Sequence, residues 1–183
     1  MKFHVKNRQA ASKSVTKQIR REGNIPAVLY SKGEKGKEIT VDGIVFKKLL
    51  DSIEPGTLSS KVLTLDLEGK EIKAIVKDIQ YHVTTYRVLH LDLEQLHDDT
   101  PVSLNIPIKC VGGVDCVGVK LGGVLRQIIR YVKVRALPKH IPAHFELDVR
   151  QLGLRQSMRL SSLSVPAGVE LRSDLKEVAV VVN

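Results

Sequence analysis

The sequence predicts a mainly β protein, in which a small N-terminal β-barrel with two or three short helices is followed by a second mainly β domain. Apolar residues recur in short alternating or continuous runs along most of the chain. Helical spacing of apolar residues is confined to two short segments before residue 55, and a clear hairpin pattern follows at 62–78. Several short strands with few helices make a closed or nearly closed sheet the simplest architecture for residues 1–94. We place the second domain at 95–183.

The first 24 residues predict a strand, a turn and a helix. Residues 2–6 alternate polar and apolar side chains, which is typical of a half-buried strand, and a turn follows through 7–10. Ser12 or Ser14 can cap the helix. A Gly-Asn pair at 23–24, with a proline soon after, is a helix-ending signal.

The basic charge of the N-terminal half is concentrated at its start. The first 21 residues carry seven basic side chains and no acidic one, whereas 22–94 carries ten basic and twelve acidic side chains. In the predicted helix, Val15 and Ile19 lie four residues apart and should face inward. The same geometry turns four polar side chains outward: Lys13, Thr16, Lys17 and Arg20. Such concentrated charge indicates a polyanionic partner, and a solvated basic face is the alternative.

The rest of the first half alternates strands with one more helix. The apolar run 25–30 is too short for a helix and predicts a strand, and 31–37 is a Gly- and Lys-rich loop. Another short strand covers 39–41. Asp42 is a good N-cap for a helix that ends at 55–56. The inward-facing residues of this helix are Val45, Phe46, Leu49 and Leu50.

The hairpin is the strongest local signal. Alternating apolar residues at 62–67 and 72–78 flank a Glu-Gly turn at 68–69. The second strand continues to Gln80 in this interpretation, and the segment 86–93 pairs with it.

In the second half, a polar segment at 96–100 precedes a proline and marks a boundary. The segment 102–111 alternates as a strand, and Pro107 confines its own position to an edge or a bulge. Glycines at 112–123 indicate turns and loops, and 151–163 is ambiguous between a short helix and a loop. Further strands are predicted at 128–137, 145–149 and 178–182.

Composition excludes several classes of protein. The formal net charge is +9 with a pI near 9.6, which favours nucleic acid or another anionic surface as partner. The absence of Trp and the few Phe and Tyr residues argue against a stacking platform for single strands. The spacing of Cys110 and Cys116 fits neither a redox pair nor half of a zinc site, so two buried thiols are expected. Without a secretory signal or a membrane-spanning run, we expect a cytoplasmic protein.

No pattern makes a convincing active site. Ser14 and Lys17 fit an S-x-x-K pattern, but its partner motifs S-D-N and K-T-G are absent. The glycines of 112–123 match no phosphate-binding spacing. His140 and His144 are separated by a proline and lack a third metal ligand. We predict no metal and no cofactor.

Three further polar residues fall near the predicted strand pair. His90 and Asp92 would share one face of a strand, close to His82, so an acid–base dyad is one interpretation. No nucleophile accompanies them, and the same residues suit hydrogen bonds to RNA. We therefore predict no catalytic residue.

The first half contains several motifs in order: Arg8, Lys13, 16–21 (TKQIRR), 23–30 (GNIPAVLY), 77–82 (KDIQYH) and 90–93 (HLDL). Together they resemble one family of bacterial ribosomal proteins that bind 5S rRNA. The second half resembles the C-terminal domain of the long members, the general stress protein Ctc form, at 102–107, 118–125 (GVKLGGVL) and 137–142 (LPKHIP).

The resemblance implies a structural protein of the large (50S) subunit whose N-terminal barrel docks on the loop E region of 5S rRNA in the central protuberance. The implied RNA-binding residues are Arg8, Lys13, Thr16, Lys17, Gln18, Arg20, Tyr30, Gln80, His82, His90 and Asp92; Arg21 joins them as a further cation for phosphates. Asp92 either accepts from the RNA or orients His90. Ser31 and Val83 depart from the family's usual Gly and Pro.

Neighbouring 50S proteins and 23S rRNA are further implied partners, with no membrane and no small-molecule substrate. The alternative function is a stress-related chaperone or enzyme that acts through the C-terminal domain.

Overall fold

The computed structural model describes residues 2–8, 12–31 and 35–183. They form two compact units, residues 1–100 and 101–183. The division falls after the polar segment that precedes Pro101, and the β strand before it runs through Gln95. The functional division into 1–94 and 95–183 stays a prediction. Across the described residues, no helix has the length and apolar character needed to cross a membrane.

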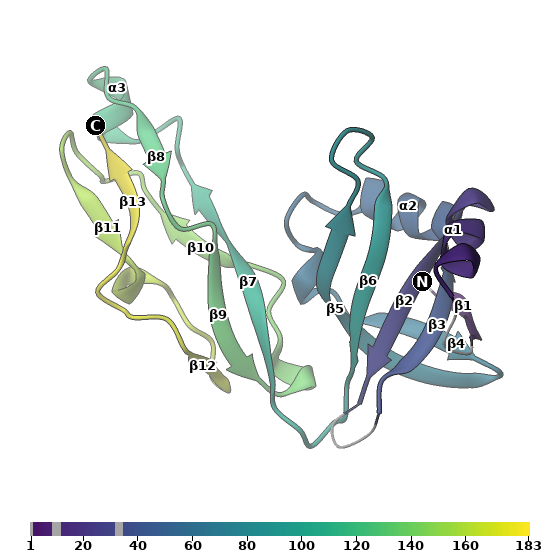
Figure 1. The fold of residues 1–183 in the computed structure, drawn as a ribbon. Helices are drawn as coiled ribbons and strands as arrows, with labels where there is room; N and C mark the ends of the chain where they lie inside the picture. Colours follow the sequence, from purple (N-terminus) through teal and green to yellow (C-terminus); the bar gives the residue numbers. More distant parts are fainter. Residues whose placement is uncertain (1, 9–11, 32–34) are drawn as a thin grey trace. The chain divides into compact units, whose positions relative to one another are not determined.

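The strands of the first unit close into a barrel, which confirms the predicted architecture (Figure 1). Closure comes from β1, which pairs antiparallel with β3 on one side and parallel with β4 on the other. Around the barrel the order is β1 (Lys2–Asn7), β3 (Lys37–Asp42), β2 (Asn24–Tyr30), β6 (Val88–Gln95), β5 (Lys70–Tyr81) and β4 (Leu63–Leu67).

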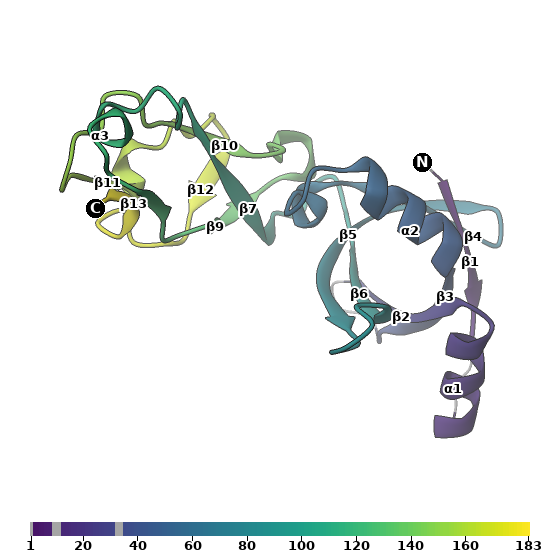
Figure 2. The ribbon, with the colours of Figure 1, turned by 90° about the horizontal axis from the view of Figure 1, so that it is seen from above.

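The barrel interior is filled by the apolar members of each alternating strand. Phe3 and Val5 are buried while their neighbours in β1 are exposed, as the period of two requires. Helix α2 (Gly43–Ser52) lies across one end of the barrel (Figure 2) and sends Phe46 into the core, where its ring centroid is 6.3 Å from that of Phe3. The Asp42 side chain accepts from the backbone N–H groups of Ile44 and Val45, so the predicted cap is confirmed.

The predicted hairpin joins β4 to β5. Both turn residues, Glu68 and Gly69, have positive φ, the conformation that matches the twist of a two-residue hairpin. Strand β5 pairs antiparallel with β6, as expected, although β6 begins at Val88 rather than at Tyr86. Tyr86 instead belongs to the connecting loop, where its φ is +52°. A short 3₁₀ helix, η1 (Leu58–Ser60), follows α2.

The second unit consists of two small sheets. One has the order β10 (Phe145–Asp148), β7 (Val102–Val111), β9 (Tyr131–Ala136) and β12 (Val169–Leu171). The other has the order β11 (Ser157–Arg159), β13 (Val178–Val182) and β8 (Leu125–Gln127). Short helical turns are α3 (Val117–Lys120), η2 (Pro138–His140) and η3 (Leu160–Ser162). The ambiguous segment 151–163 thus contains a strand and a 3₁₀ turn.

Pro107 lies at a local edge of β7, as its missing N–H requires. The next residue, Ile108, donates to the Arg130 carbonyl on the β9 side. Successive backbone groups of a strand point to opposite sides, so the nitrogen of Pro107 points away from β9. On that side β10 begins to pair only at Ile108.

The glycine-rich segment is used for packing, which agrees with the prediction of turns rather than a phosphate loop. A Cβ on Gly118 would lie 2.8 Å from a backbone carbon of Gly153, and one on Gly123 would lie 2.7 Å from the Gly118 carbonyl oxygen. Both cysteines are free. Cys116 is buried as expected, but Cys110 is only partly buried, because it sits near the end of β7.

Candidate nucleic-acid interface

Helix α1 (Lys13–Arg21) is unusually exposed for part of a small folded unit. None of its residues is buried, and it projects from the barrel (Figure 2). Ile19 is half-buried as expected, but Val15 is 43% exposed, so the predicted inner face is only partly covered. A helix that buries so little of its apolar face gains little from packing on its own protein. Its surface is therefore free to meet a partner.

Of the side chains predicted to face outward on α1, Lys13, Lys17 and Arg20 are exposed, whereas Thr16 is half-buried. Lys13, Lys17 and Arg21 are exposed, and none of them has an ion-pair partner among the described residues. Gln18 instead donates to Glu22 at 3.0 Å. Ser12 occupies the N-cap position, but its hydroxyl bonds the Ser14 hydroxyl at 2.7 Å rather than a backbone N–H. Part of the turn expected at 7–10 lies outside the described residues.

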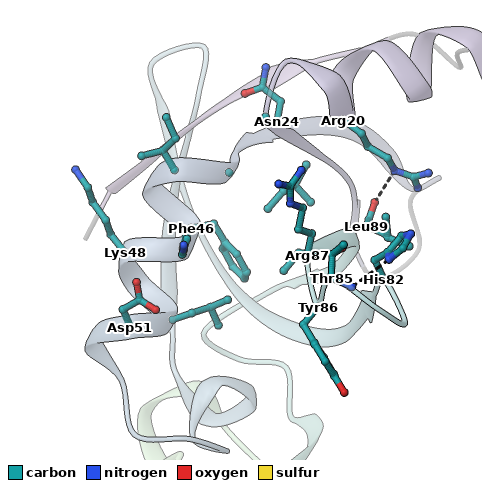
Figure 3. Close-up of a pocket in the computed structure, with 17 residues that line it drawn as sticks. Arg20, Asn24, Phe46, Lys48, Asp51, His82, Thr85, Tyr86, Arg87 and Leu89 are labelled. Carbon is teal, nitrogen blue, oxygen red and sulfur yellow. Dashed lines mark hydrogen bonds between the residues drawn. The ribbon is translucent and has the colours of Figure 1, made fainter.

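Arg20 connects this helix to the sheet. Its Nε donates to the Leu89 carbonyl oxygen at 3.1 Å, one residue before His90 (Figure 3). That bond leaves the terminal guanidinium nitrogens available for a second acceptor. The helix and the outer face of β6 therefore form adjoining parts of one surface.

Tyr30, Gln80, His90 and Asp92 lie together on the outer face of three neighbouring strands. Gln80 of β5 is opposite His90 of β6. Asp92 is in register with Val28 of β2, and Tyr30 follows two residues later on the same face, 45% exposed. The outward-facing polar residues of β5 and β6 thus form a polar patch, which consists of Asp78, Gln80, His90 and Asp92.

His90 and Asp92 interact directly. The His90 Nδ1 is 2.8 Å from an Asp92 carboxylate oxygen, with both side chains mostly covered. This contact fixes the ring and directs Nε2 away from the carboxylate. The orienting role proposed for Asp92 is the one its geometry supports.

His82 is held by its own loop. Its Nδ1 lies 3.3 Å from the Thr85 backbone N–H and 3.1 Å from the Thr84 hydroxyl, and its backbone N–H donates to the Arg87 carbonyl. An Nδ1 that accepts from an N–H carries no proton of its own, so the ring proton is on Nε2. Val83, at the position where the resemblance suggested proline, is 86% exposed and takes no part in these bonds.

Arg8 reaches the same face through β3. Its guanidinium is 3.2 Å from the Glu38 carboxylate and is only 14% exposed, while its Nε is buried without a hydrogen-bond partner among the described groups. Glu38 is in register with Val28, so this ion pair borders the polar patch. Ser31, the other departure from the family pattern, bonds His97 Nε2 through its hydroxyl at 3.0 Å.

The structure adds residues that sequence reasoning missed. Arg87 and Tyr86 lie in the loop beside His82 (Figure 3), and Lys47 and Lys48 of α2 line the same cavity as this loop. The adjacent aromatic and basic residues at 86–87 are a sequence pattern that could have indicated an RNA contact. The sequence alone does not indicate that α2 contributes to this surface, because that depends on how the helix lies against the barrel.

The two histidines of the second unit have different neighbours. His144 Nε2 is 3.4 Å from Glu146, while the His140 ring lies against Gly168. Within the described parts of the chain, no group of three His, Cys, Asp or Glu residues is arranged to hold a metal ion.

Comparisons with known proteins cover both units. A sequence profile described as the Ribosomal L25p family matches residues 3–93, and one described as Ribosomal protein TL5, C-terminal domain, matches residues 101–183. The chain belongs to the ribosomal L25p family. The large ribosomal subunit protein bL25 of Chlamydia pneumoniae is 55% identical over 183 residues, which cover 100% of this chain and 99% of that protein. The bL25 protein of Chlamydia trachomatis serovar D is 56% identical over 182 residues, covering 100% and 98%.

Membership of the L25p family confirms the resemblance drawn from the motifs, including the match of the second half to the long form. The family consists of ribosomal proteins and not of enzymes, as the sequence predicted.

Proposed function

We propose that this L25p protein is a structural component of the large ribosomal subunit, in the cytoplasm, and that it binds 5S rRNA at the loop E region in the central protuberance. The observation that carries the proposal is the Arg20–Leu89 hydrogen bond, which joins an exposed basic helix to a polar patch on the barrel. Contacts of residues 95–183 with neighbouring 50S proteins or 23S rRNA belong to the same proposal.

The two parts of the surface have different chemistry. Helix α1 supplies cations for phosphates through Lys13, Lys17, Arg20 and Arg21, and such contacts position a protein on RNA without reading its sequence. The patch supplies hydrogen-bond donors and acceptors through Gln80 and His90, and the neighbouring loop adds His82. A-form RNA presents 2′-hydroxyls and base edges in a wide, shallow minor groove, which short polar side chains on a sheet can reach.

Three carboxylates on or beside the patch already contact a basic side chain. Asp92 contacts His90, Glu38 contacts Arg8, and Glu94 lies 2.6 Å from the Lys77 ammonium group. The Arg8 guanidinium and the Lys77 ammonium group offset the repulsion that the Glu38 and Glu94 carboxylates would otherwise exert on a phosphate.

The test compares the full-length protein with two variants in binding to 5S rRNA. Arg20→Ala is expected to weaken binding by about 1–3 kcal/mol, because it removes a guanidinium at the centre of the surface. Lys2→Ala is the matched control, since Lys2 of β1 is paired with Glu71 of β5. Equal losses of affinity for the two variants would show that binding depends only on the total positive charge and not on this site. Co-sedimentation with 50S particles tests the ribosomal location separately.

A further inference from the structure

The first unit contains a cavity next to the proposed interface. It has a volume of about 1020 Å³ and lies between the end of α1, helix α2 and the loop 82–87 (Figure 3). Its wall is apolar where Ile44, Val88 and Leu89 line it, whereas the lining residues Ile25 and Phe46 are buried in the barrel core. Ligand sites in proteins measure about 300–1,000 Å³, so this cavity is large enough for a single nucleotide.

The rim of the cavity is strongly basic. Four basic residues line it, Arg20, Lys47, Lys48 and Arg87, and among the described residues Asp51 is the only carboxylate in the lining. Lys47, Lys48 and Arg87 form no ion pair within the described part of the chain. Unpaired cations around an apolar wall favour an occupant with an anionic part and a flat apolar part.

The cavity is continuous with the interface. Arg20 and His82 line the cavity and also belong to the proposed RNA-binding set. The loop that forms one wall is closed by hydrogen bonds from the His82 backbone to Arg87 and from the Tyr86 backbone to His82. The wall is thus formed before any ligand arrives, and Tyr86 is 78% exposed beside it.

We propose that this cavity takes one unpaired nucleotide of the RNA bound at the interface, with its base against the apolar wall and its phosphate between Arg87 and Lys47. The inference rests on the proposed function. A base offers a π-face and apolar area to the wall, and a phosphate matches the rim. An unpaired nucleotide is the suitable occupant, because extracting a paired base would cost stacking and pairing free energy.

The experiment uses the full-length protein and 5S rRNA transcribed with 4-thiouridine. Irradiation followed by mass spectrometry is expected to place a crosslink in the peptide 82–88, at one position of the RNA. The double variant Lys47→Ala/Arg87→Ala should lose this crosslink and bind about tenfold more weakly. Lys61→Ala/Lys70→Ala is the charge-matched control, since both lysines are exposed in the same unit and away from the cavity.

Three results would overturn the inference. If the double variant binds like the wild type while Arg20→Ala still weakens binding, the cavity is empty and the proposed function stands. If the wild type does not bind 5S rRNA, both fail together. If AMP or UMP binds the free protein and the double variant loses that binding without losing affinity for 5S rRNA, the cavity is a site for free nucleotides.

Discussion

A Cβ added to Gly43 would lie 2.1 Å from the carbonyl oxygen of Gly23. Gly43 is the first residue of α2, and Gly23 follows the end of α1. The start of one helix therefore rests directly on the backbone that ends the other. Backbone at this position cannot move aside as the tip of a flexible side chain can, so only glycine fits.

We expect Gly43→Ala to lower the free energy of unfolding by about 1–3 kcal/mol, the usual cost of overpacking a closely packed site. Urea denaturation measures the change. Because α1 would shift with Gly23, binding to 5S rRNA should weaken as well. The control is Gly113→Ala, whose added Cβ meets Leu125 Cδ2 at an ordinary 3.4 Å. An unfolding free energy unchanged by Gly43→Ala would contradict the close approach.

The contact between His90 and Asp92 predicts strong coupling between them. If Asp92 acts by orienting His90, then Asp92→Ala should weaken RNA binding in the wild type and have almost no effect in a His90→Ala background. A double-mutant cycle on 5S rRNA affinity measures this coupling. Additive losses would instead show that Asp92 contacts the RNA independently of His90.

The two cysteines should differ in reactivity. Burial raises the pKa of the Cys110 thiol, so its thiolate fraction near pH 8 is smaller in the folded protein than in the unfolded chain. Iodoacetamide should therefore alkylate Cys110 more slowly in the native protein than in urea, with a rate that keeps rising at higher pH. Cys116 is buried and donates to the Leu152 carbonyl, so it should react later still. Peptide mass spectrometry follows both sites, and equal native and denatured rates for Cys110 would contradict the prediction.

The elements predicted correctly are those whose pattern is local. Alternation alone places β1, and the Glu68-Gly69 turn sets the β4–β5 hairpin. The strands β8, β11 and β12 have only three residues each, and such a length carries no periodicity. These short strands form by pairing with longer neighbouring strands. For example, Val180 of β13 pairs with Gln127 of β8 on one side and with Met158 of β11 on the other.

In the candidate surface, too, local features could be predicted from the sequence and long-range contacts could not. The sequence indicates the basic face of α1, since helical spacing alone groups Lys13 and Lys17. It does not indicate that Arg20 reaches Leu89, because these residues are 69 positions apart. The cavity could not be predicted from the sequence for the same reason, because its rim combines two segments far apart in the chain, α2 and the loop 82–87.

The salt dependence of binding should distinguish residues that contact phosphates from residues that contact bases or sugars. If Lys17 contacts a phosphate, the logarithm of the binding constant for 5S rRNA falls with the logarithm of salt concentration, and Lys17→Ala flattens that slope by roughly 0.7–0.9. Gln80→Ala should instead lower the affinity at every salt concentration and leave the slope unchanged, because a neutral amide releases no counterion. Filter-binding titrations at several salt concentrations give both slopes. Parallel lines for the wild type and Lys17→Ala would show that Lys17 faces solvent in the complex, and the RNA-contacting face of α1 would then lie toward Arg21.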